Sequence, residues 1–236
     1  MALIEDAAKR RKEGKSVSTG SYERVFNDKE LGYLISDVQS TSISNGNELE
    51  KKIITKAKDI VIDNTKIFQD LLDRKYTGSQ ELFLIPKKII KKSDWGNSNE
   101  PDFIIFNRKT ETIFIIELKD GWVFDTKKSL AEKEGLEKFI TLTSPKVSYK
   151  MDYFICSFSN NDVEEIHKGL KFAIDIEHIM TGKKFCELLG LSYDEINNER
   201  AIDGEKNANY FIENVLKINK VREWIRVNIS TFDETK

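Results

Sequence analysis

Two carboxylates and a lysine stand at the ends of two neighbouring apolar runs. Asp102 opens the run 102–106 (DFIIF), and Glu117 and Lys119 close the run 112–119 (TIFIIELK). Carboxylates held rigidly side by side bind hard cations such as Mg²⁺, and an ammonium group next to them can hold a water molecule. These residue types point to metal-assisted hydrolysis, with a phosphate as the group that the cation would polarise.

The polar segment 107–111 between the two runs predicts a β-hairpin. In an antiparallel hairpin the start of the first strand lies beside the end of the second. Alternation along the second strand places Glu117 and Lys119 on one face and Leu118 on the other. The sequence therefore predicts that Asp102, Glu117 and Lys119 converge.

The spacing of an acid two residues before a lysine carries little information by itself, because it occurs six times in this chain. Only the triplet at Glu117 ends a predicted central strand and follows the chain's sole Pro-Asp pair by the length of a hairpin. A solvated strand end is the plain alternative for any one of the three residues. The predicted convergence of all three favours a functional site.

The elements around this hairpin are predicted from hydrophobic periodicity. Before it, we expect one long helix over 46–74 and a strand after Gly78, in which Pro86 indicates a bulge or an edge position. The run 112–119 is apolar on both faces and should be central in the sheet. After it, we expect a helix capped by Asp125 or Thr126, a strand over 149–158, a strand over 170–176, a helix over 183–191 and a helix over 206–227. The order helix, three strands, helix, strand predicts an α/β fold with a mixed central sheet flanked by helices, and with additional helices at the C-terminus.

Composition narrows the classes of protein that this chain can belong to. Among 236 residues, 38 Lys and Arg balance 40 Asp and Glu, so the chain does not bind polyanions by overall basicity. No segment is long and apolar enough to be a signal peptide or a membrane span. Cys156 and Cys186 are too few for a disulfide framework or a zinc cluster and suggest reduced thiols in the cytoplasm. With only His167 and His178, nucleases that need a histidine base plus a histidine ligand are excluded.

Pro101-Asp102 followed by Glu117-Leu118-Lys119 resembles the motif of the PD-(D/E)XK nuclease superfamily. The predicted order αβββαβ over about 46–158 also resembles the restriction-endonuclease-like core of that family, so the resemblance covers roughly half of the chain. It implies a Mg²⁺-dependent phosphodiesterase acting on DNA, with Mn²⁺ able to replace Mg²⁺. It further implies that Asp102 and Glu117 bind the metal, that the carbonyl of Leu118 is a third ligand, and that Lys119 orients or activates the attacking water.

Members of this family often place a glutamate from the first helix near the metal, and Glu48 and Glu50 are the two candidates here. At about 100° per residue, Glu50 falls inside the apolar stripe of the helix while Glu48 points nearly the opposite way. An acid inside an apolar stripe must find a partner, so Glu50 is the predicted catalytic residue, with an ordinary salt bridge as the alternative.

Lysines near the motif are predicted to contact DNA phosphates, although each could instead belong to a solvated face. They are Lys127 and Lys128 at the start of the helix after the hairpin, and Lys87, Lys88, Lys91 and Lys92 after the first strand.

The chain most resembles the type II restriction enzymes of this superfamily. The resemblance implies sequence-specific cleavage of double-stranded DNA with 5′-phosphate ends, a homodimer matched to a palindromic site, and a cognate DNA methyltransferase encoded alongside. We expect a polar basic arm at 1–28, a nuclease core at 29–160 and a mainly helical extension at 161–236, packed on the core, that reads bases or pairs subunits. A structure-specific or repair nuclease of the same fold, and a non-catalytic DNA-binding module, are the alternatives.

Overall fold

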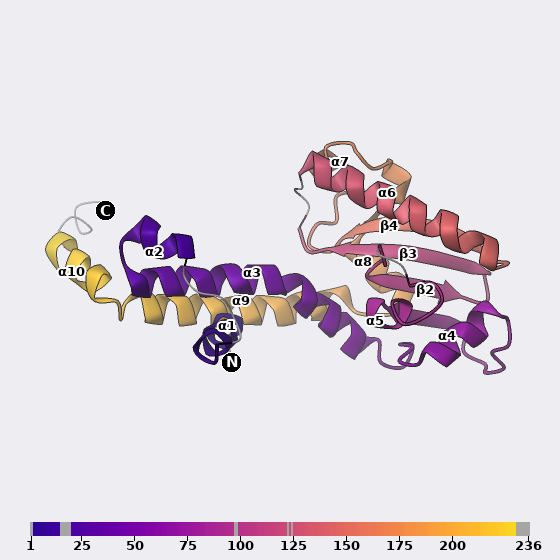
Figure 1. Cartoon of the computed structure of the whole chain (residues 1–236), viewed down its shortest axis with the longest axis horizontal. Helices are drawn as coiled ribbons and strands as arrows, with labels where there is room; N and C mark the ends of the chain where they lie inside the picture. The colour runs from indigo at the N-terminus through magenta and orange to yellow at the C-terminus, as the bar shows by residue number, and fades with distance from the viewer. Residues whose placement is uncertain (1, 15–19, 97–98, 122, 124, 230–236) are drawn as a thin grey trace. The chain divides into compact units, whose positions relative to one another are not determined.

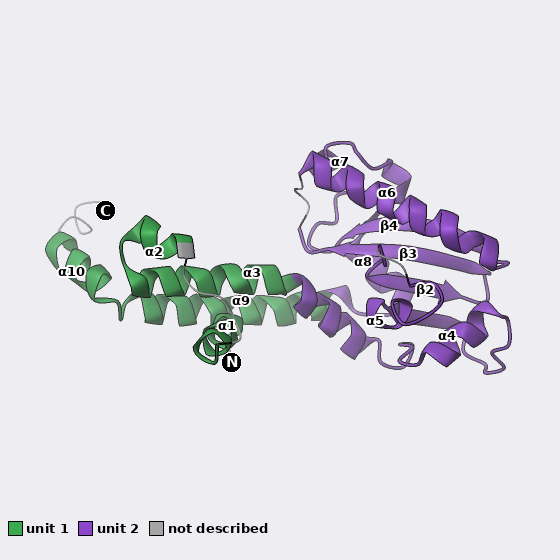
Figure 2. Cartoon of the chain, viewed as in Figure 1, with its two compact units in different colours: residues 1–45, 194–236 green, residues 46–193 purple. Residues whose placement is uncertain are grey.

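The structure is a computed structural model that describes residues 2–14, 20–96, 99–121, 123 and 125–229. The chain divides into two compact units (Figure 2). Unit 1 comprises residues 1–45 and 194–236, and unit 2 comprises residues 46–193. The sheet and the motif residues belong to unit 2.

Five strands of the described ranges form one sheet in unit 2: β1 (Leu82–Pro86), β2 (Phe103–Asn107), β3 (Thr112–Lys119), β4 (Lys150–Ser157) and β5 (Ile179–Thr181). They are ordered β1-β2-β3-β4-β5 across the sheet, and Figure 1 labels the three middle strands, β2, β3 and β4. The pairs β1–β2 and β2–β3 are antiparallel, and the pairs β3–β4 and β4–β5 are parallel. The sheet is therefore mixed, with β3 at its centre.

Helices surround this sheet and build unit 1. The helices within unit 2 are α4 (Thr65–Leu72), α5 (Lys87–Ile90), α6 (Thr126–Thr143), α7 (Val163–Gly169) and α8 (Gly182–Leu189), with short 3-10 helices at Ser144–Lys146 and Ile176–His178. Unit 1 contains α1 (Leu3–Lys12), α2 (Gly20–Phe26) and α10 (Asn219–Asn228). Two longer helices, α3 (Lys29–Lys56) and α9 (Tyr193–Val215), cross the boundary between the units along the chain. None of the described helices has the length and apolar content needed to span a bilayer.

The predicted mixed α/β fold with extra C-terminal helices is confirmed. The strands expected over 102–106, 112–119 and 149–158 correspond to β2, β3 and β4, and β1 lies at the edge of the sheet as Pro86 indicated. The helix over 183–191 corresponds to α8. The start of α6 is fixed by Asp125, whose side chain accepts a hydrogen bond from the backbone N–H of Lys128.

The main core lies on one face of the sheet, where β-branched and aromatic side chains meet α4 and α6. Trp95 joins the two helices, because its ring lies edge-on to Phe68 of α4 at 5.6 Å and to Phe139 of α6 at 6.0 Å. All three side chains are at most 2% exposed. This packing anchors α6 along β3 and β4, as Figure 1 also shows.

The opposite face of the sheet is covered by α8. Phe185 of this helix packs on Phe103 of β2, with ring centroids 6.1 Å apart, and both are fully buried. Because both faces of β2 are covered, its two ends are the places where polar side chains can meet solvent.

The single long helix predicted over 46–74 is wrong. α3 ends at Lys56, and the chain then forms a bridge between Val61 and Leu84 of β1. Asn64 starts α4 as a separate helix by accepting a hydrogen bond from the N–H of Lys66. Val61, one of the apolar residues that continue the helical pattern, is used in this bridge to the edge of the sheet, and the later ones belong to α4.

Two predictions in the C-terminal third are also wrong. The strand expected over 170–176 is absent from the described structure, because Lys171 and Phe172 have positive φ angles of 56° and 58°, which extended strands do not adopt. The helix expected over 206–227 is two helices, since α9 begins at Tyr193, and Ile218 has an extended conformation just before α10. The early part of α9 escaped detection because it is polar, with Ile196 as its buried residue.

Within unit 1, an ion pair joins α1 to α3. Arg11 of α1 donates to both carboxylate oxygens of Asp37 of α3 at 2.9 and 2.8 Å, and its guanidinium lies 4.2 Å from the ring centre of Tyr33. The N–H of Ile4 donates to the side chain of Asn207, which brings α9 to the same place. The predicted basic arm at 1–28 thus contains α1 and α2, and one of its cations is engaged within the fold.

Replacement of Phe139 should destabilise unit 2 strongly. Phe139→Ala removes a ring that is 1% exposed, so we expect a loss of about 3–5 kcal/mol in the free energy of unfolding. The matched control is Phe172→Ala, whose side chain is 66% exposed and for which we expect a loss below about 1 kcal/mol. Urea unfolding followed by circular dichroism measures both, and equal losses would contradict the described core.

Candidate active site

The pairing of β2 with β3 brings the three motif residues together. Phe103 pairs with Ile116, so Asp102 lies opposite Glu117 on the face that also carries Lys119. Asp102 is 8% exposed, and its Oδ2 accepts a hydrogen bond of 2.9 Å from the backbone N–H of Leu118. This bond fixes the Asp102 carboxylate against the end of β3, and the Leu118 side chain is buried on the other face.

Lys119 is held between two carboxylates. Its Nζ lies 2.9 Å from Oε1 of Glu117 and 2.6 Å from Oε2 of Glu132, a residue of α6. Burial alone would lower the pKa of Lys119, but the two carboxylates outweigh it and raise this pKa. Lys119 is therefore a fixed cation and suits the orientation of a water better than its deprotonation.

Glu117 and Asp102 form a pair of like charges in a poorly hydrated place. Burial, together with the nearby charge of Asp102, raises the pKa of Glu117 to about 7, and Lys119 offsets only part of this effect. A bound divalent cation would remove the repulsion between the two carboxylates. The acid pair therefore has the electrostatic character of a cation site.

Two further charged residues border the acid pair. Nζ of Lys87, the first residue of α5, lies 3.1 Å from Oδ1 of Asp102. Burial and the charge of Asp102 raise the pKa of Glu50 above its ordinary value, and Lys87 offsets part of this effect. Glu50 therefore lies within electrostatic range of Asp102 and Lys87. Glu48, in contrast, forms an ion pair of 2.8 Å with Lys51. Of the two glutamates weighed on α3, Glu50 is thus the one with an electrostatic interaction with Asp102, and its catalytic role stays a prediction.

The donor set fits a divalent cation of the Mg²⁺ type. Within the described residues no group of three or more Asp, Glu, His or Cys side chains is close enough together to ligate a metal ion. Mg²⁺ is commonly held by one or two carboxylates and keeps several waters, and Asp102 and Glu117 provide such a pair.

Two acids beside the motif were not predicted from the sequence. A cavity of about 240 Å³ borders Glu117, and Glu132 and the buried Glu100 line it together with Lys87. Glu132 has a recognisable signal, because it follows Ser129 by three residues and precedes Leu136 by four, and both of these are buried on α6. It is an acid on a buried helical face, the same pattern that selected Glu50.

Most of the lysines predicted to contact DNA lie on the surface. Lys87 reaches the acid pair, whereas the others are exposed and make no contact with the motif residues that the structure describes: Lys88, Lys91, Lys92, Lys127 and Lys128. Their contact with phosphates stays a prediction.

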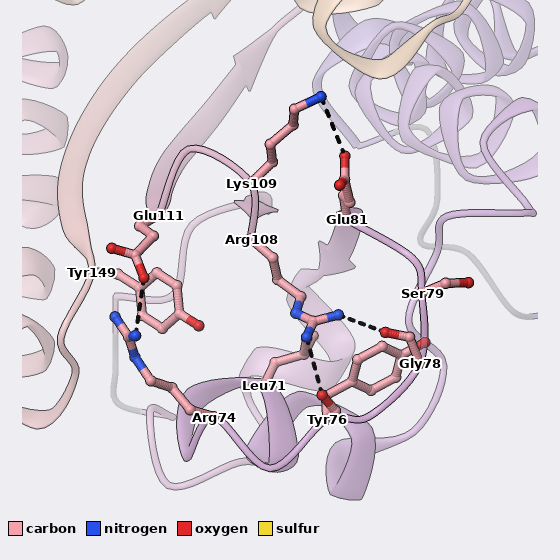
Figure 3. A pocket seen from close by; sticks show the side chains of 10 residues that line it. All are labelled: Leu71, Arg74, Tyr76, Gly78, Ser79, Glu81, Arg108, Lys109, Glu111 and Tyr149. Atoms are coloured by element: carbon pink, nitrogen blue, oxygen red, sulfur yellow. Dashed lines mark hydrogen bonds and ion pairs between the residues drawn. The ribbon is translucent and has the colours of Figure 1, made fainter.

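A larger cavity, of about 440 Å³, lies at the opposite end of the strands (Figure 3). Its charged groups are used within the fold. Arg108 donates to the backbone carbonyls of Tyr76, Gly78 and Gln80, and Arg74 pairs with Glu111 at 3.0 Å. The hydrogen bonds of Arg108 therefore hold the loop before β1 in place, and the motif residues lie at the other end of the strands.

A mixed sheet with a buried acid pair and a lysine held beside it is an arrangement that enzymes cleaving phosphodiester bonds with the help of a cation can use. Comparison with known proteins gives the particular family. The chain is 43% identical over 218 residues to the type II restriction enzyme HhaII of Haemophilus parahaemolyticus, covering 90% of this chain and 95% of that enzyme. The chain therefore belongs to the type II restriction endonucleases, which are site-specific endodeoxyribonucleases. No protein-family model matches it, and no solved structure gives a significant match.

Replacement of Glu117 should stabilise the metal-free protein at high pH. Because the pKa of Glu117 rises from its ordinary value of 4.5 to about 7 on folding, its ionisation destabilises the folded state as the pH rises through this window. Glu117→Gln does not ionise, so with a chelator present we expect it to be more stable than the wild type at pH 8 by about 1–3 kcal/mol. The gain should shrink toward pH 4.

Urea unfolding at both pH values measures this difference. Glu111→Gln serves as the control, since Glu111 lies before the other end of β3 with a side chain that is 59% exposed, and its effect should stay within about 0.5 kcal/mol. A gain for Glu117→Gln that does not vary with pH would contradict the described electrostatics.

Proposed function

We propose that this restriction endonuclease is a member of the PD-(D/E)XK superfamily and hydrolyses both strands of DNA at a specific site with Mg²⁺. The observation that carries the proposal is the convergence of Asp102, Glu117 and Lys119 at one end of the β2–β3 hairpin. Pro101-Asp102 and Glu117-Leu118-Lys119 resemble the motif of that superfamily, which supports the proposal. The identity to a type II restriction enzyme over most of the chain supports the same conclusion.

Asp102 and Glu117 would hold the cation, with the carbonyl of Leu118 as a third ligand. When bound, Mg²⁺ would neutralise charge on the scissile phosphate and lower the pKa of a coordinated water, and Mn²⁺ would serve as well. The hydrogen bond from the N–H of Leu118 keeps Asp102 oriented for this role. Glu50 is the additional catalytic acid, supported by its electrostatic contact with Asp102.

Lys119 orients the water that attacks the phosphorus. Its ammonium is fixed beside Glu117, so a water bound there would face the phosphate in one orientation. The bond to the 3′ oxygen breaks and the phosphate stays on the 5′ side, which gives 5′-phosphate ends. Lysines around the site would bind neighbouring phosphates: Lys87, Lys88, Lys91, Lys92, Lys127 and Lys128.

Cleavage of long double-stranded DNA tests this function directly. Purified protein is incubated with DNA and Mg²⁺, or with a chelator, and the ends are sequenced. We expect discrete ends at one short motif, carrying 5′-phosphates, and no cleavage with the chelator. Random ends would favour a structure-specific or repair nuclease, and intact DNA with both Mg²⁺ and Mn²⁺ would favour a non-catalytic DNA-binding module.

Substitutions in the motif test the assignment of residues. Asp102→Asn, Glu117→Gln and Lys119→Ala should each lower the single-turnover cleavage rate at least about 100-fold while DNA binding in Ca²⁺ is retained. Glu50→Gln should lower it less. The control Glu81→Gln, an exposed acid at the other end of the sheet, should cut at the wild-type rate. Retained cutting by two of the three motif variants would overturn the assignment.

We propose that two copies of the chain form a homodimer, because each chain offers one such site and two strands must be cut. Most of the exposed large apolar side chains in the described ranges belong to unit 1. Ile43, Trp224 and Val227 are 74%, 57% and 73% exposed. Unit 1, which holds most of the extension at 161–236, is therefore the proposed dimer surface.

Light scattering after gel filtration measures the mass of the wild type, which we expect to be twice 27.3 kDa. Val227→Asp should shift the protein toward the monomer and slow cleavage of both strands. The control Leu142→Asp changes a side chain of α6 that is 47% exposed, in unit 2, and should stay dimeric. A monomeric wild type at micromolar concentration would contradict the dimer.

A cell that makes such an enzyme needs protection for its own recognition sites. We propose a methyltransferase of the same site specificity as the genetic partner, and the cytoplasm as the compartment in which both act. The two free, buried thiols of Cys156 and Cys186 are consistent with a reducing compartment.

A further inference from the structure

The ammonium of Lys119 has two carboxylate partners, Glu117 and Glu132, and only Glu117 belongs to the acid pair. Glu117 accepts a hydrogen bond from the ammonium through one oxygen, at 2.9 Å, and belongs to the acid pair with Asp102. Glu132 offers both carboxylate oxygens, at 2.7 and 2.6 Å. The side chains of all three residues are only 17–19% exposed, so solvent weakens these contacts little.

Glu132 stands on a rigid support. It lies in the second turn of α6, whose start is capped by Asp125 and whose later turns are anchored by the buried Leu136 and Phe139. A carboxylate on such a helix has a fixed position relative to the end of β3. The contact with Lys119 therefore joins the motif strand to the helix that follows it.

A divalent cation on the acid pair would change the balance between the two partners. A carboxylate whose charge is shared with a metal ion attracts a neighbouring ammonium less strongly, and the metal ion itself repels that ammonium. Glu117 would then attract Lys119 less strongly, while Glu132, which stands on α6 and is not part of the acid pair, would still hold it.

We propose that Glu132 is a positioning residue that keeps the Lys119 ammonium at the cleavage site when the acid pair binds its divalent cation. This inference rests on the proposed function, in which Lys119 orients the attacking water. Glu132 does not need to touch the substrate, because it acts through Lys119.

Glu132→Gln tests this role, since it keeps the shape of the side chain and removes its charge. The matched control is Glu134→Gln, the same change at an exposed position of the same helix. We expect Glu132→Gln to lower the single-turnover cleavage rate about 10- to 100-fold, with DNA affinity in Ca²⁺ changed less than about threefold. Glu132→Asp, which restores the charge, should recover part of the rate.

A second measurement reads the position of Lys119 without activity. Acetylation of Lys119 by acetic anhydride is followed by mass spectrometry in the full chain, with chelator or with Ca²⁺. We expect Glu132→Gln to speed this acetylation several-fold, and more in Ca²⁺ than in chelator, whereas Glu134→Gln leaves it unchanged.

The outcomes separate this inference from the proposed function. Wild-type cleavage and wild-type Lys119 reactivity in Glu132→Gln would overturn the inference and leave the function intact. A higher Mg²⁺ requirement with unchanged Lys119 reactivity would also overturn it, because Glu132 would then be a metal ligand. Failure of the wild type to cut any DNA would overturn the proposed function, even if the acetylation pattern were as expected.

Discussion

The antiparallel pairing of β2 with β3 places Phe103 opposite Ile116, and the whole site depends on this register. A slip by one residue would turn either Asp102 or the pair of Glu117 and Lys119 to the other face of the sheet. Packing favours this register, because the side chains of β2 are buried on both faces and a slip would move each of them to the other face. The geometry of the candidate site thus follows from how the apolar residues of a short hairpin are buried.

Buried charge is the second constraint on this end of the sheet. The chain alternates cations and anions there, with Lys87 against Asp102 and Lys119 between Glu117 and Glu132. The cations offset part of the free-energy cost of burying several carboxylates. The repulsion between Asp102 and Glu117 is only partly relieved. The residual repulsion identifies the pair that a divalent cation would stabilise most.

The hairpin and the order of helices and strands along the chain from β1 to β4 could be predicted from the sequence because they depend on local patterns. Alternation, the polar turn and the Pro101-Asp102 pair all lie within twenty residues of one another. The break in the helix predicted over 46–74 was not predictable in this way, because it depends on Val61 bridging to Leu84 of the sheet. The positive φ angles of Lys171 and Phe172 likewise override a sequence that favours a strand. Glu132 was missed because its partner Lys119 is thirteen residues away on another element, although its place on the buried face of α6 was a usable signal.

The two edges of the sheet are also protected from adding further strands. Along β1, the segment around Val61 takes up the outer backbone groups of Leu84, whose N–H donates to Ile60 and whose carbonyl accepts from Ile62. Pro86 has no N–H to offer, and β5 at the opposite edge is only three residues long. Two copies of the chain that meet at their sheet edges therefore have few free backbone groups with which to pair. This disfavours aggregation by β-strand addition. Association between copies then depends on side-chain surfaces.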